Sequence, residues 1–482
     1  MKSVRLFLLA LLLLGVVGCS VNPVTGKRQL NFYSEEDEIA LGAQADPAIV
    51  AHYGLLDDEQ VQDYVKDIGQ RMVPVSHRPN LKFHFKVLDD PIVNAFALPG
   101  GYVYITRGIL AYLDNEAALA GVVGHEIGHV TAQHGVTKMS GQSVLGLGLA
   151  LGSAVASDIP FIGDIAGTSA QLLFLKYGRD DERQSDELGV QYATALGYDT
   201  TQMAEFFHSL DRLSPENGGL PGWMSTHPDP GDRWVTVREL TAKAQQTKAG
   251  PFETDRDRYL DRVDGLVFGT NPREGYFSAD AFHHPDLHFR FPVPDGWTGQ
   301  NTRAAVGLFA PESDAVIILG GVDGSSARAA ASTWVGREGV KNLGQQDVKM
   351  AGDRGVRTQV RITTDEGVLR VVSSFFKRDG TVWVMHGYAA EADFAQHEST
   401  FIAVMNGFAE ETDPEVLAVR PVRLRIVAAP RNESFTAFAA RYPIPEGAMI
   451  DSVQGLAILN GVEIDDAVAA GRRIKVLVRT TP

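Results

Sequence analysis

Two histidines and a glutamate at fixed spacing are the residues of this 482-residue chain most suited to chemistry; they lie in residues 125–129, His-Glu-Ile-Gly-His. Residues 115–139 contain no proline and predict one helix. At 3.6 residues per turn, His129 lies roughly 40° around the helix axis from His125, and Glu126 lies roughly 100° from it. Two imidazoles one turn apart can bind one metal ion, and the adjacent carboxylate can take a proton from a water bound to that ion.

A second side of this predicted helix carries small residues at helical spacing. They are Ala117, Gly121, Gly124 and Gly128. Each glycine costs about 1 kcal/mol of helix propensity relative to alanine, so close packing must favour it. A neighbouring apolar stripe gives the helix a core to pack on. It consists of Leu119, Val123, Ile127 and Val130. The pattern predicts that another segment packs very close against the glycine side.

The His-Glu-x-x-His spacing is typical of zinc peptidases, because neutral imidazoles suit zinc. Five-residue matches also arise by chance, and an amphipathic helix can carry two surface histidines, so a third ligand has to decide. Residues 180–189 predict a second helix in which Glu182 and Asp186 lie one turn apart. One carboxylate can bind the metal, while the other accepts the second N–H of a ligating histidine. By charge alone, the same residues would form an acidic surface.

The chain as a whole is acidic, with 44 basic against 60 acidic side chains and a net charge of −16. No basic run compensates for this charge, which argues against a nucleic-acid partner. The length predicts two to four domains and room for a large core.

The first residues resemble an export signal. Basic residues precede an apolar run over residues 6–17 that is too short to span a bilayer. Cys19, the only cysteine of the chain, follows in a context resembling a bacterial lipobox, where the signal is removed and the new N-terminal cysteine receives lipid. We expect a signal peptide over residues 1–18 and a lipidated tether over residues 19–33; a buried cysteine in an uncleaved anchor is the alternative. By resemblance to lipoprotein sorting, the serine after Cys19 favours the outer membrane.

Strand patterns lead into the predicted metal-binding helix. Residues 94–98 and 102–105 flank Pro-Gly-Gly and predict a hairpin. In many zinc peptidases an exposed strand edge pairs with extended substrate, and main-chain hydrogen bonds accept diverse side chains. We expect the following residues to bind substrate in this way: Asn94, Ala95, Phe96 and Ala97. Plain sheet packing is the alternative.

These motifs together resemble one known family. Residues 94–101 (Asn-Ala-Phe-Ala-Leu-Pro-Gly-Gly), residues 125–129 and the Glu182-x-x-x-Asp186 spacing are similar to the HtpX and CAAX-prenyl-protease family of zinc metallopeptidases. Within that family, the lipobox and the turn after it resemble the exported lipoprotein branch, the BepA-like periplasmic proteases. The resemblance covers roughly half of the chain. Ser185 stands where this resemblance leads us to expect alanine, a mild departure.

The resemblance implies a role for each residue of the site. It implies one Zn²⁺ per chain, held by His125, His129 and Glu182. It further implies that Glu126 is the general base and that Asp186 supports a ligating histidine from behind.

The resemblance also implies that a His-Pro segment approaches the metal. His227 would fill the open coordination position in a resting enzyme, or would help to stabilise the transition state together with Arg233. A loop histidine in front of a helix capped by Asp229 is the remaining interpretation.

The remaining sequence predicts accessory parts. After a linker over residues 251–285, in which His283 and His284 form a turn, residues 286–415 predict an α+β domain without a catalytic constellation. Residues 416–482 have the order strand, helix, helix, strand and weakly resemble a LysM module, a fold associated with glycan binding. Such a module would contact peptidoglycan or serve as a structural cap.

The expected fold class is α+β: a mostly helical zincin-type metallopeptidase domain over residues 34–250 with a small β-sheet, then the α+β domain and the βααβ module. We expect a zinc-dependent endopeptidase of the bacterial envelope, facing the periplasm and bound to the membrane through lipid on Cys19. Its expected substrates are unfolded or misassembled envelope proteins. The alternatives are an envelope assembly factor or chaperone with latent proteolysis, and a peptidoglycan-binding lipoprotein with a structural metal.

Overall fold

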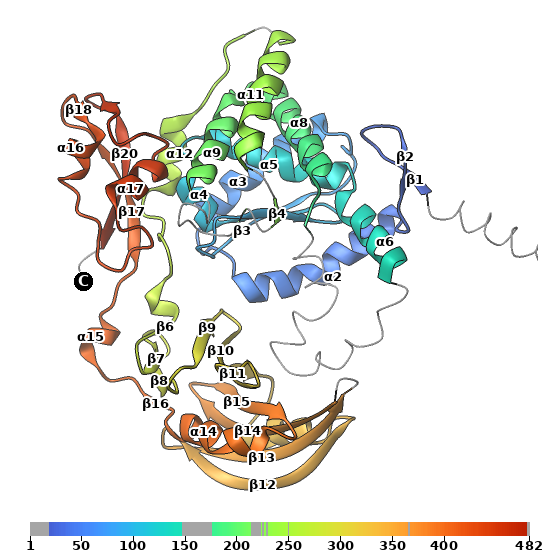
Figure 1. The fold of residues 1–482 in the computed structure, drawn as a ribbon, viewed down its shortest axis with the longest axis vertical. Helices are drawn as coiled ribbons and strands as arrows, with labels where there is room; N and C mark the ends of the chain where they lie inside the picture. Colours follow the sequence, from blue (N-terminus) through green and yellow to red (C-terminus); the bar gives the residue numbers. More distant parts are fainter. Residues whose placement is uncertain are drawn as a thin grey trace, which may run out of the picture. The chain divides into compact units, whose positions relative to one another are not determined.

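A computed structural model describes residues 19–146, 176–213, 223, 226–227, 230–248, 250–364 and 367–479. The expected signal peptide, residues 1–18, lies outside them. The chain divides into two compact units (Figure 1). The first joins Met1–Gly148, Thr168–Thr270 and Val422–Thr480, and the second contains Asn271–Pro421. Both helices and strands build the chain, so the expected α+β class is confirmed.

The first unit is mainly helical. Its longer helices are α2 (Glu35–Tyr53), α3 (Glu59–Met72), α5 (Glu116–Thr131), α6 (His134–Gly146), α8 (Arg179–Ala195), α9 (Thr201–Arg212) and α11 (Pro230–Gln246). Its shorter elements include α4 (Arg107–Tyr112), α12 (Arg256–Val263), β1 (Cys19–Val21), β2 (Arg28–Leu30), β3 (His84–Leu88), β4 (Ala95–Leu98) and β5 (Tyr102–Thr106). Residues 251–285, which were expected to form a linker, contain α12. Tyr259 and Leu260 of α12 are fully buried.

A small sheet lies beside the helices, with β5 as its central strand in the order β3-β5-β4. β3 runs parallel to β5, whereas β4 runs antiparallel to it, with Ala97 opposite Val103. In the β4–β5 turn, Gly100 has a φ of 78°, and a Cβ at this position would lie 2.6 Å from the carbonyl oxygen of Glu38. The expected hairpin is therefore confirmed, and the close approach of α2 requires glycine in its turn.

α5 is buried along its whole length and packs directly against α8 (Figure 1). A Cβ on Gly124 would lie only 3.1 Å from the Cα of Gly189, and a Cβ on Gly128 only 3.2 Å from the Cα of Ser185. A Cβ at either position would be tighter than most Cβ contacts and would force the neighbouring helix to shift by a few tenths of an ångström. The expected close packing against the glycine side is confirmed.

The expected single helix over residues 115–139 is wrong, because the chain breaks it in two. α5 and α6 are separated at Gln133, whose φ of 60° is left-handed. Residues distant in sequence bind this break: Asn22 Nδ2 donates to the carbonyl oxygen of Ala132 at 3.1 Å, and Gln29 Nε2 donates to Gln133 Oε1 at 2.9 Å. The β1–β2 hairpin is thus bound to the chain at the point where α5 ends.

The C-terminal segment shares the core of the first unit. β17 (Val422–Ala428) pairs antiparallel with β20 (Arg473–Arg479), and between them in sequence lie β18 (Glu433–Ser434), α16 (Phe435–Ala439), α17 (Val453–Leu459) and β19 (Ala467–Val468). The strand, helix, helix, strand order expected from the sequence is present, with two short strands added. Its buried apolar side chains belong to the same hydrophobic cluster as those of α3, α5 and α9.

Lys475 of β20 fixes this segment to the loop in front of α5. Its side chain is fully buried, and its Nζ donates to the carbonyl oxygens of Ala111 at 3.0 Å and Leu113 at 2.9 Å. Burial lowers the pKa of Lys475 to about 8. This contact joins the last strand of the described chain to residues more than 360 positions earlier in the sequence.

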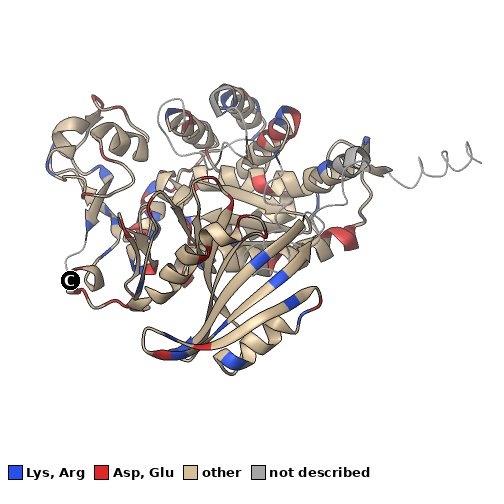
Figure 2. Ribbon diagram, turned by 60° about the horizontal axis from the view of Figure 1, so that its bottom comes forward, with Lys and Arg blue, Asp and Glu red and all other residues tan. Residues whose placement is uncertain are grey.

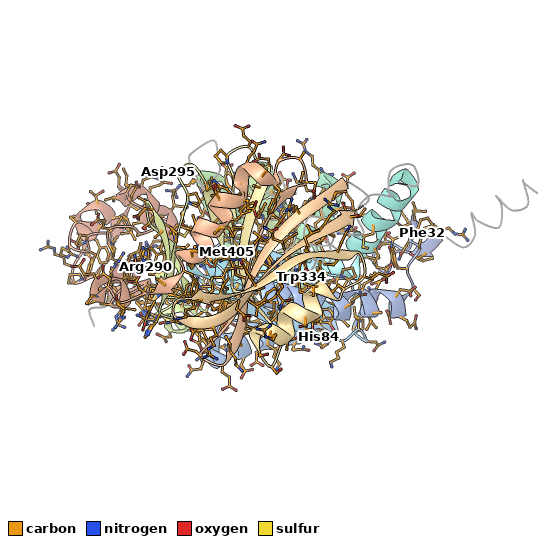
Figure 3. All side chains as sticks on the ribbon, turned by 90° about the horizontal axis from the view of Figure 1, so that it is seen from below. Phe32, His84, Arg290, Asp295, Trp334 and Met405 are labelled. Atoms are coloured by element: carbon orange, nitrogen blue, oxygen red, sulfur yellow. The ribbon has the colours of Figure 1, made fainter. Side chains whose placement is uncertain are left out.

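The second unit is built on a seven-stranded antiparallel sheet in the order β12-β13-β14-β15-β11-β10-β9. These strands are β9 (Thr298–Asn301), β10 (Ala305–Phe309), β11 (Ala315–Val322), β12 (Val340–Met350), β13 (Asp353–Thr364), β14 (Gly367–Arg378) and β15 (Thr381–Ala390). α13 (Ala327–Val335) packs with Trp334 on one face, and α14 (Phe394–Asn406) packs with Met405 on the other (Figure 3). A smaller sheet contains β6 (Tyr276–Phe277), β7 (Ala281–His284), β8 (Phe289–Pro292) and β16 (Ala409–Glu410).

One expectation for the second unit is wrong, and one of its strands has no strand pattern in its sequence. His283 and His284, expected to form a turn, lie in β7, where His284 is opposite Phe289 and His283 Nδ1 lies 2.5 Å from Glu411 Oε2. β12 was not expected as a strand, because its residues 341–347 are all exposed and show no apolar alternation.

Leu424 allows a test of whether the C-terminal segment and α5 fold together. Leu424 is fully buried in β17, and its main chain pairs with Gly265 and Leu266. We expect Leu424→Ala to lower the free energy of unfolding of the first unit by roughly 2–5 kcal/mol, because it leaves a cavity in the shared core. Amide hydrogen exchange of α5, read by mass spectrometry, should rise accordingly.

Val453→Ala is the matched control, because Val453 of α17 is 37% exposed. We expect it to change stability by no more than about 0.5 kcal/mol. Unchanged exchange of α5 in Leu424→Ala would mean that the C-terminal segment folds independently.

Candidate metal centre

Four side chains from three parts of the chain converge in the buried interior of the first unit. Potential ligand atoms of His125, His129, Glu182 and His227 all lie within 4.8 Å of one another. The Nε2 atoms of His125 and His129 are 3.0 Å apart, and oxygens of Glu182 lie 3.6 Å and 3.5 Å from them. The packing of α5 on α8 therefore brings together the three ligands expected from the sequence.

The residues present fit a zinc ion. Imidazole nitrogens and one carboxylate are a typical zinc donor set. Burial lowers the pKa of His125 to about 4 and the pKa of His129 well below its usual value, so both rings are neutral. The Nε2 atoms of the two neutral rings face each other, and there is room for only one proton between them. A metal cation at this place would instead bind the Nε2 lone pairs of both rings.

Glu126 lies beside this cluster with a free carboxylate. Both of its oxygens are buried, and neither has a hydrogen-bond partner among the described residues. Burial raises the pKa of Glu126 to about 7. A buried carboxylate without a partner is expensive to maintain, which points to a ligand or reactant that contacts it.

The second nitrogen of His125 is held by α8. His125 Nδ1 lies 3.0 Å from Asp186 Oδ1, as expected for a carboxylate that supports a ligating histidine. Arg233 of α11 donates to Asp186 through Nε at 2.9 Å and through Nη2 at 2.6 Å, and its Nη1 lies 2.8 Å from Glu182 Oε2. Burial alone would raise the pKa of Asp186, but the charge of Arg233 brings it below the usual value. Arg233 thus fixes both α8 carboxylates.

The second nitrogen of His129 is held by a histidine that the sequence analysis did not assign. His134 Nδ1 lies 3.0 Å from His129 Nδ1, and His134 Nε2 lies 2.9 Å from Gln184 Oε1. Because Gln184 Oε1 can only accept, His134 Nε2 donates to it and His134 Nδ1 accepts from His129. This chain of hydrogen bonds leaves the Nε2 lone pair of His129 free to face the centre. Ser185, the mild departure from the expected alanine, places its Oγ 3.3 Å from His134 Nδ1.

His227 enters the cluster from the segment before α11. Its Nδ1 lies 2.9 Å and 3.1 Å from the two oxygens of Glu182, and its Nε2 lies 3.6 Å from Glu126 Oε1. Burial alone would lower the pKa of His227, but Glu182 and Glu126 raise it above the usual value. The His227 ring stacks on Trp223 with centroids 4.4 Å apart. Asp229, expected to cap α11, lies outside the described residues.

A family model describes this part of the chain: residues 59–241 match Peptidase family M48. Residues 59–241 are an M48 peptidase domain. Zinc is the metal of this family, and the four-residue cluster is the set of described residues that could hold it.

Curated relatives are similar to part of the chain. The chain is 30% identical over 216 residues to the Beta-barrel assembly-enhancing protease of Escherichia coli (strain K12), which covers 43% of each chain. It is 26% identical over 231 residues to the Mitochondrial metalloendopeptidase OMA1 of Schizosaccharomyces pombe, covering 46% of this chain and 66% of that one. The chain thus spans less than half the length of the first of these relatives.

Solved structures match the chain only loosely. LpqN, involved in cell envelope biogenesis of Mycobacterium tuberculosis, aligns with a TM-score of 0.23 and 15% identity over 26% of this chain and 83% of that one.

The expected substrate strand lies at the edge of the M48 domain's sheet. Among the described residues β4 pairs only with β5, so one side of its main chain has no strand partner. Its side chains are buried, however: Phe96 is 7% exposed and stacks on Tyr104 with centroids 4.9 Å apart. Asn94, also buried, lies with its Oδ1 3.4 Å from Thr226 Oγ1, next to His227. One main-chain edge of the strand is therefore unpaired among the described residues, and its role in substrate binding stays a prediction.

Cys19 is the first residue of β1 and lies opposite Leu30 of β2. Within the described ranges, no helix has both the length and the apolar character that a membrane crossing requires.

His134 can be tested through metal affinity. We expect His134→Leu to weaken zinc binding by roughly 10–100-fold, because it removes the acceptor that orients His129. His134→Asn should keep much of the affinity, since an amide oxygen can accept the same hydrogen bond. Competition with a chromophoric chelator measures both, and His208→Leu in α9 is the control. Parent-like zinc affinity in His134→Leu would show that another group orients His129.

Proposed function

We propose that the chain is a zinc-dependent endopeptidase of the bacterial cell envelope. The observation that carries this proposal is the meeting of His125, His129 and Glu182 beside the carboxylate of Glu126, whose oxygens have no hydrogen-bond partner among the described residues. In this proposal the first three bind the metal and Glu126 is the catalytic base. Asp186 holds His125 and His134 holds His129.

The chemistry follows from this arrangement. Zinc, when bound, lowers the pKa of a coordinated water and polarises the scissile carbonyl. Glu126 takes a proton from the attacking water and passes it to the leaving amine, first as base and then as acid. Its position suits both steps, since burial raises its pKa to about 7 and no hydrogen bond ties up its oxygens. Arg233 keeps Asp186 and Glu182 ionised and fixed while the charge of the reaction changes nearby.

We further propose that extended peptide substrates pair with the free edge of β4. Two observations support this. Asn94, at the start of the strand, contacts Thr226 next to His227, so the strand lies close to the centre. The edge offers main-chain hydrogen bonds that do not depend on substrate sequence, which suits substrates recognised by their unfolded state. Asn94, Ala95, Phe96 and Ala97 would line this edge.

His227 is proposed to fill the open coordination position at rest. Its Nδ1 lies 3.4 Å from His125 Nε2 and contacts both oxygens of Glu182. The imidazole thus lies where a substrate carbonyl or a water would have to bind. Trp223 stacks on the ring and holds it there. Substrate would then have to displace His227 before cleavage. The alternative is that His227 stabilises the transition state.

The proposed place of action is the periplasmic side of the outer membrane, through lipid on Cys19. The proposed substrates are unfolded or misassembled envelope proteins. An apolar signal-like start, the lone cysteine and a relative whose name includes β-barrel assembly support this setting. The peptidoglycan contact expected for residues 416–482 stays a prediction, and the shared core of that segment with the M48 domain favours its role as a structural cap.

A second function is favoured by the position of His227. A centre blocked at rest would suit an assembly factor or chaperone that cleaves rarely and acts mainly by binding its clients. Glu126→Gln distinguishes the two functions in a deletion strain, because full rescue would favour the binding role.

Glu126→Gln also tests the chemistry. We expect it to keep the metal, since Glu126 is not a ligand, and to lose turnover of an unfolded protein such as reduced casein by at least about 100-fold. Glu187→Gln is the matched control, because Glu187 is an exposed carboxylate of α8. Metal analysis and cleavage are measured on the same preparations. Parent-like cleavage by Glu126→Gln would reject the assignment.

His227→Ala tests the blocked centre. If the imidazole fills the open position and substrate has to displace it, its removal should lower KM, and so raise kcat/KM by the inverse of the fraction of parent molecules in which that position is free. Zinc content should stay unchanged, since three ligands remain. A fall in kcat with unchanged KM would instead assign His227 to the transition state.

A further inference from the structure

The seven-stranded sheet of the second unit has a row of positive charges at one end. Arg354 of β13 lies directly opposite Lys349 of β12. β13 and β14 pair Gly355 with Phe376, so Lys377 is the next residue beside Arg354 on the same face. Side chains opposite each other on neighbouring strands have Cβ atoms about 4.5–5.5 Å apart, and like charges in these positions destabilise a sheet. The strands of this sheet are in front in Figure 2, where Lys and Arg are blue.

Nothing in the described part of the chain neutralises this row. Lys349, Arg354 and Lys377 are exposed and have no salt bridge to any described carboxylate, and Lys377 Nζ donates only to the carbonyl oxygen of Ser325 at 3.1 Å. A second row, on the opposite face, differs in this respect: Arg361 binds Glu391 at 2.7 Å. In an acidic chain, the uncompensated row is therefore a local exception that an anion would stabilise.

The row lines a cavity of about 640 Å³ between the sheet and the start of α13. This volume lies within the range of roughly 300–1,000 Å³ typical of small-molecule sites. Asp347 is the one carboxylate among the lining residues, and Arg328, which also lines the cavity, binds it at 2.5 Å. Ser326 caps α13 at the same place, so the positive end of the helix dipole adds to the field.

The cavity walls are apolar where the charges are absent. Ala327 and Val356 form these walls. A concave site with charged and apolar walls suits a small molecule with an anionic group and an organic body better than the flat surface of a folded protein. A guanidinium beside two ammonium groups matches the oxygens of a phosphate group, which accept several hydrogen bonds at once.

We propose that this cavity binds a phosphate-bearing ligand through Lys349, Arg354 and Lys377. The phosphate belongs either to a soluble phosphate ester or to the headgroup of an anionic phospholipid, since both present the same group. The site is separate from the proposed metal centre, and it would exist whether or not the M48 domain cleaves peptides.

The test uses the full chain and two probes. Glycerol 3-phosphate is titrated by calorimetry, and flotation compares phosphatidylcholine vesicles with and without phosphatidylglycerol. We expect the double variant Lys349→Gln/Arg354→Gln to lose at least about tenfold in affinity for the probe that binds, because it removes two charge-assisted hydrogen bonds. Lys341→Gln/Arg290→Gln is the control, with the same change in net charge at two other exposed positions of the second unit.

Each outcome decides the matter. Binding of glycerol 3-phosphate that the double variant weakens and the control keeps supports a soluble phosphate ester. Binding only to vesicles with phosphatidylglycerol, with the same dependence on the variants, supports a lipid headgroup. If neither probe binds, or if the double variant binds as the control does, the proposal is overturned.

Discussion

The contact between the α5 and α8 backbones is the constraint on which the site depends. At Gly124 and Gly189 the two helices approach so closely that an added methyl group would reach the opposite backbone. This distance decides whether Glu182 can meet two imidazoles on α5. Three glycines in α5 and one in α8 lower the intrinsic stability of these helices. Packing in the hydrophobic core that the first unit shares with the C-terminal segment acts against that loss. Local helix propensity is thus given up so that the ligands can converge.

The interior of the first unit carries an unusual concentration of ionisable groups. Three histidines, three carboxylates and Arg233 lie fully or almost fully buried around one point. Such a cluster is stable only when nearly every member has a partner of opposite charge or a hydrogen bond. Arg233 supplies much of this compensation, since it contacts Asp186 and Glu182 at once. Glu126 has no hydrogen bond to either oxygen among the described residues, and its ion pair with His227 is long, at 3.6 Å. Glu126 is also the group for which the proposed chemistry needs freedom.

Local sequence patterns were sufficient to predict the metal ligands, but not all of the residues that orient those ligands. The spacing of His125 and His129 matches helix periodicity, and the glycine stripe predicted a closely packed neighbour. The histidine pair and the close packing could therefore both be predicted from one amino-acid sequence. His134 could not, because the expected helix ran through Gln133, and the break that turns His134 back toward His129 is fixed by residues near position 22. A clue was present in a third histidine shortly after the second. β12 escaped prediction because its exposed residues lack alternation, and the shared core of the C-terminal segment depends on contacts between distant parts of the sequence.

The β1–β2 hairpin at the end of α5 limits how far the first unit could extend from a lipid on Cys19. Asn22 and Gln29 are bound to the carboxyl end of the helix that carries both histidines, and only two residues separate Cys19 from Asn22. If Cys19 carries lipid, the hairpin leaves almost no slack between the acyl chains and the first unit. The catalytic centre would then be held at a short and nearly fixed distance from the bilayer. Polypeptides diffusing freely through the periplasm would encounter it far less often than chains stalled at the membrane itself.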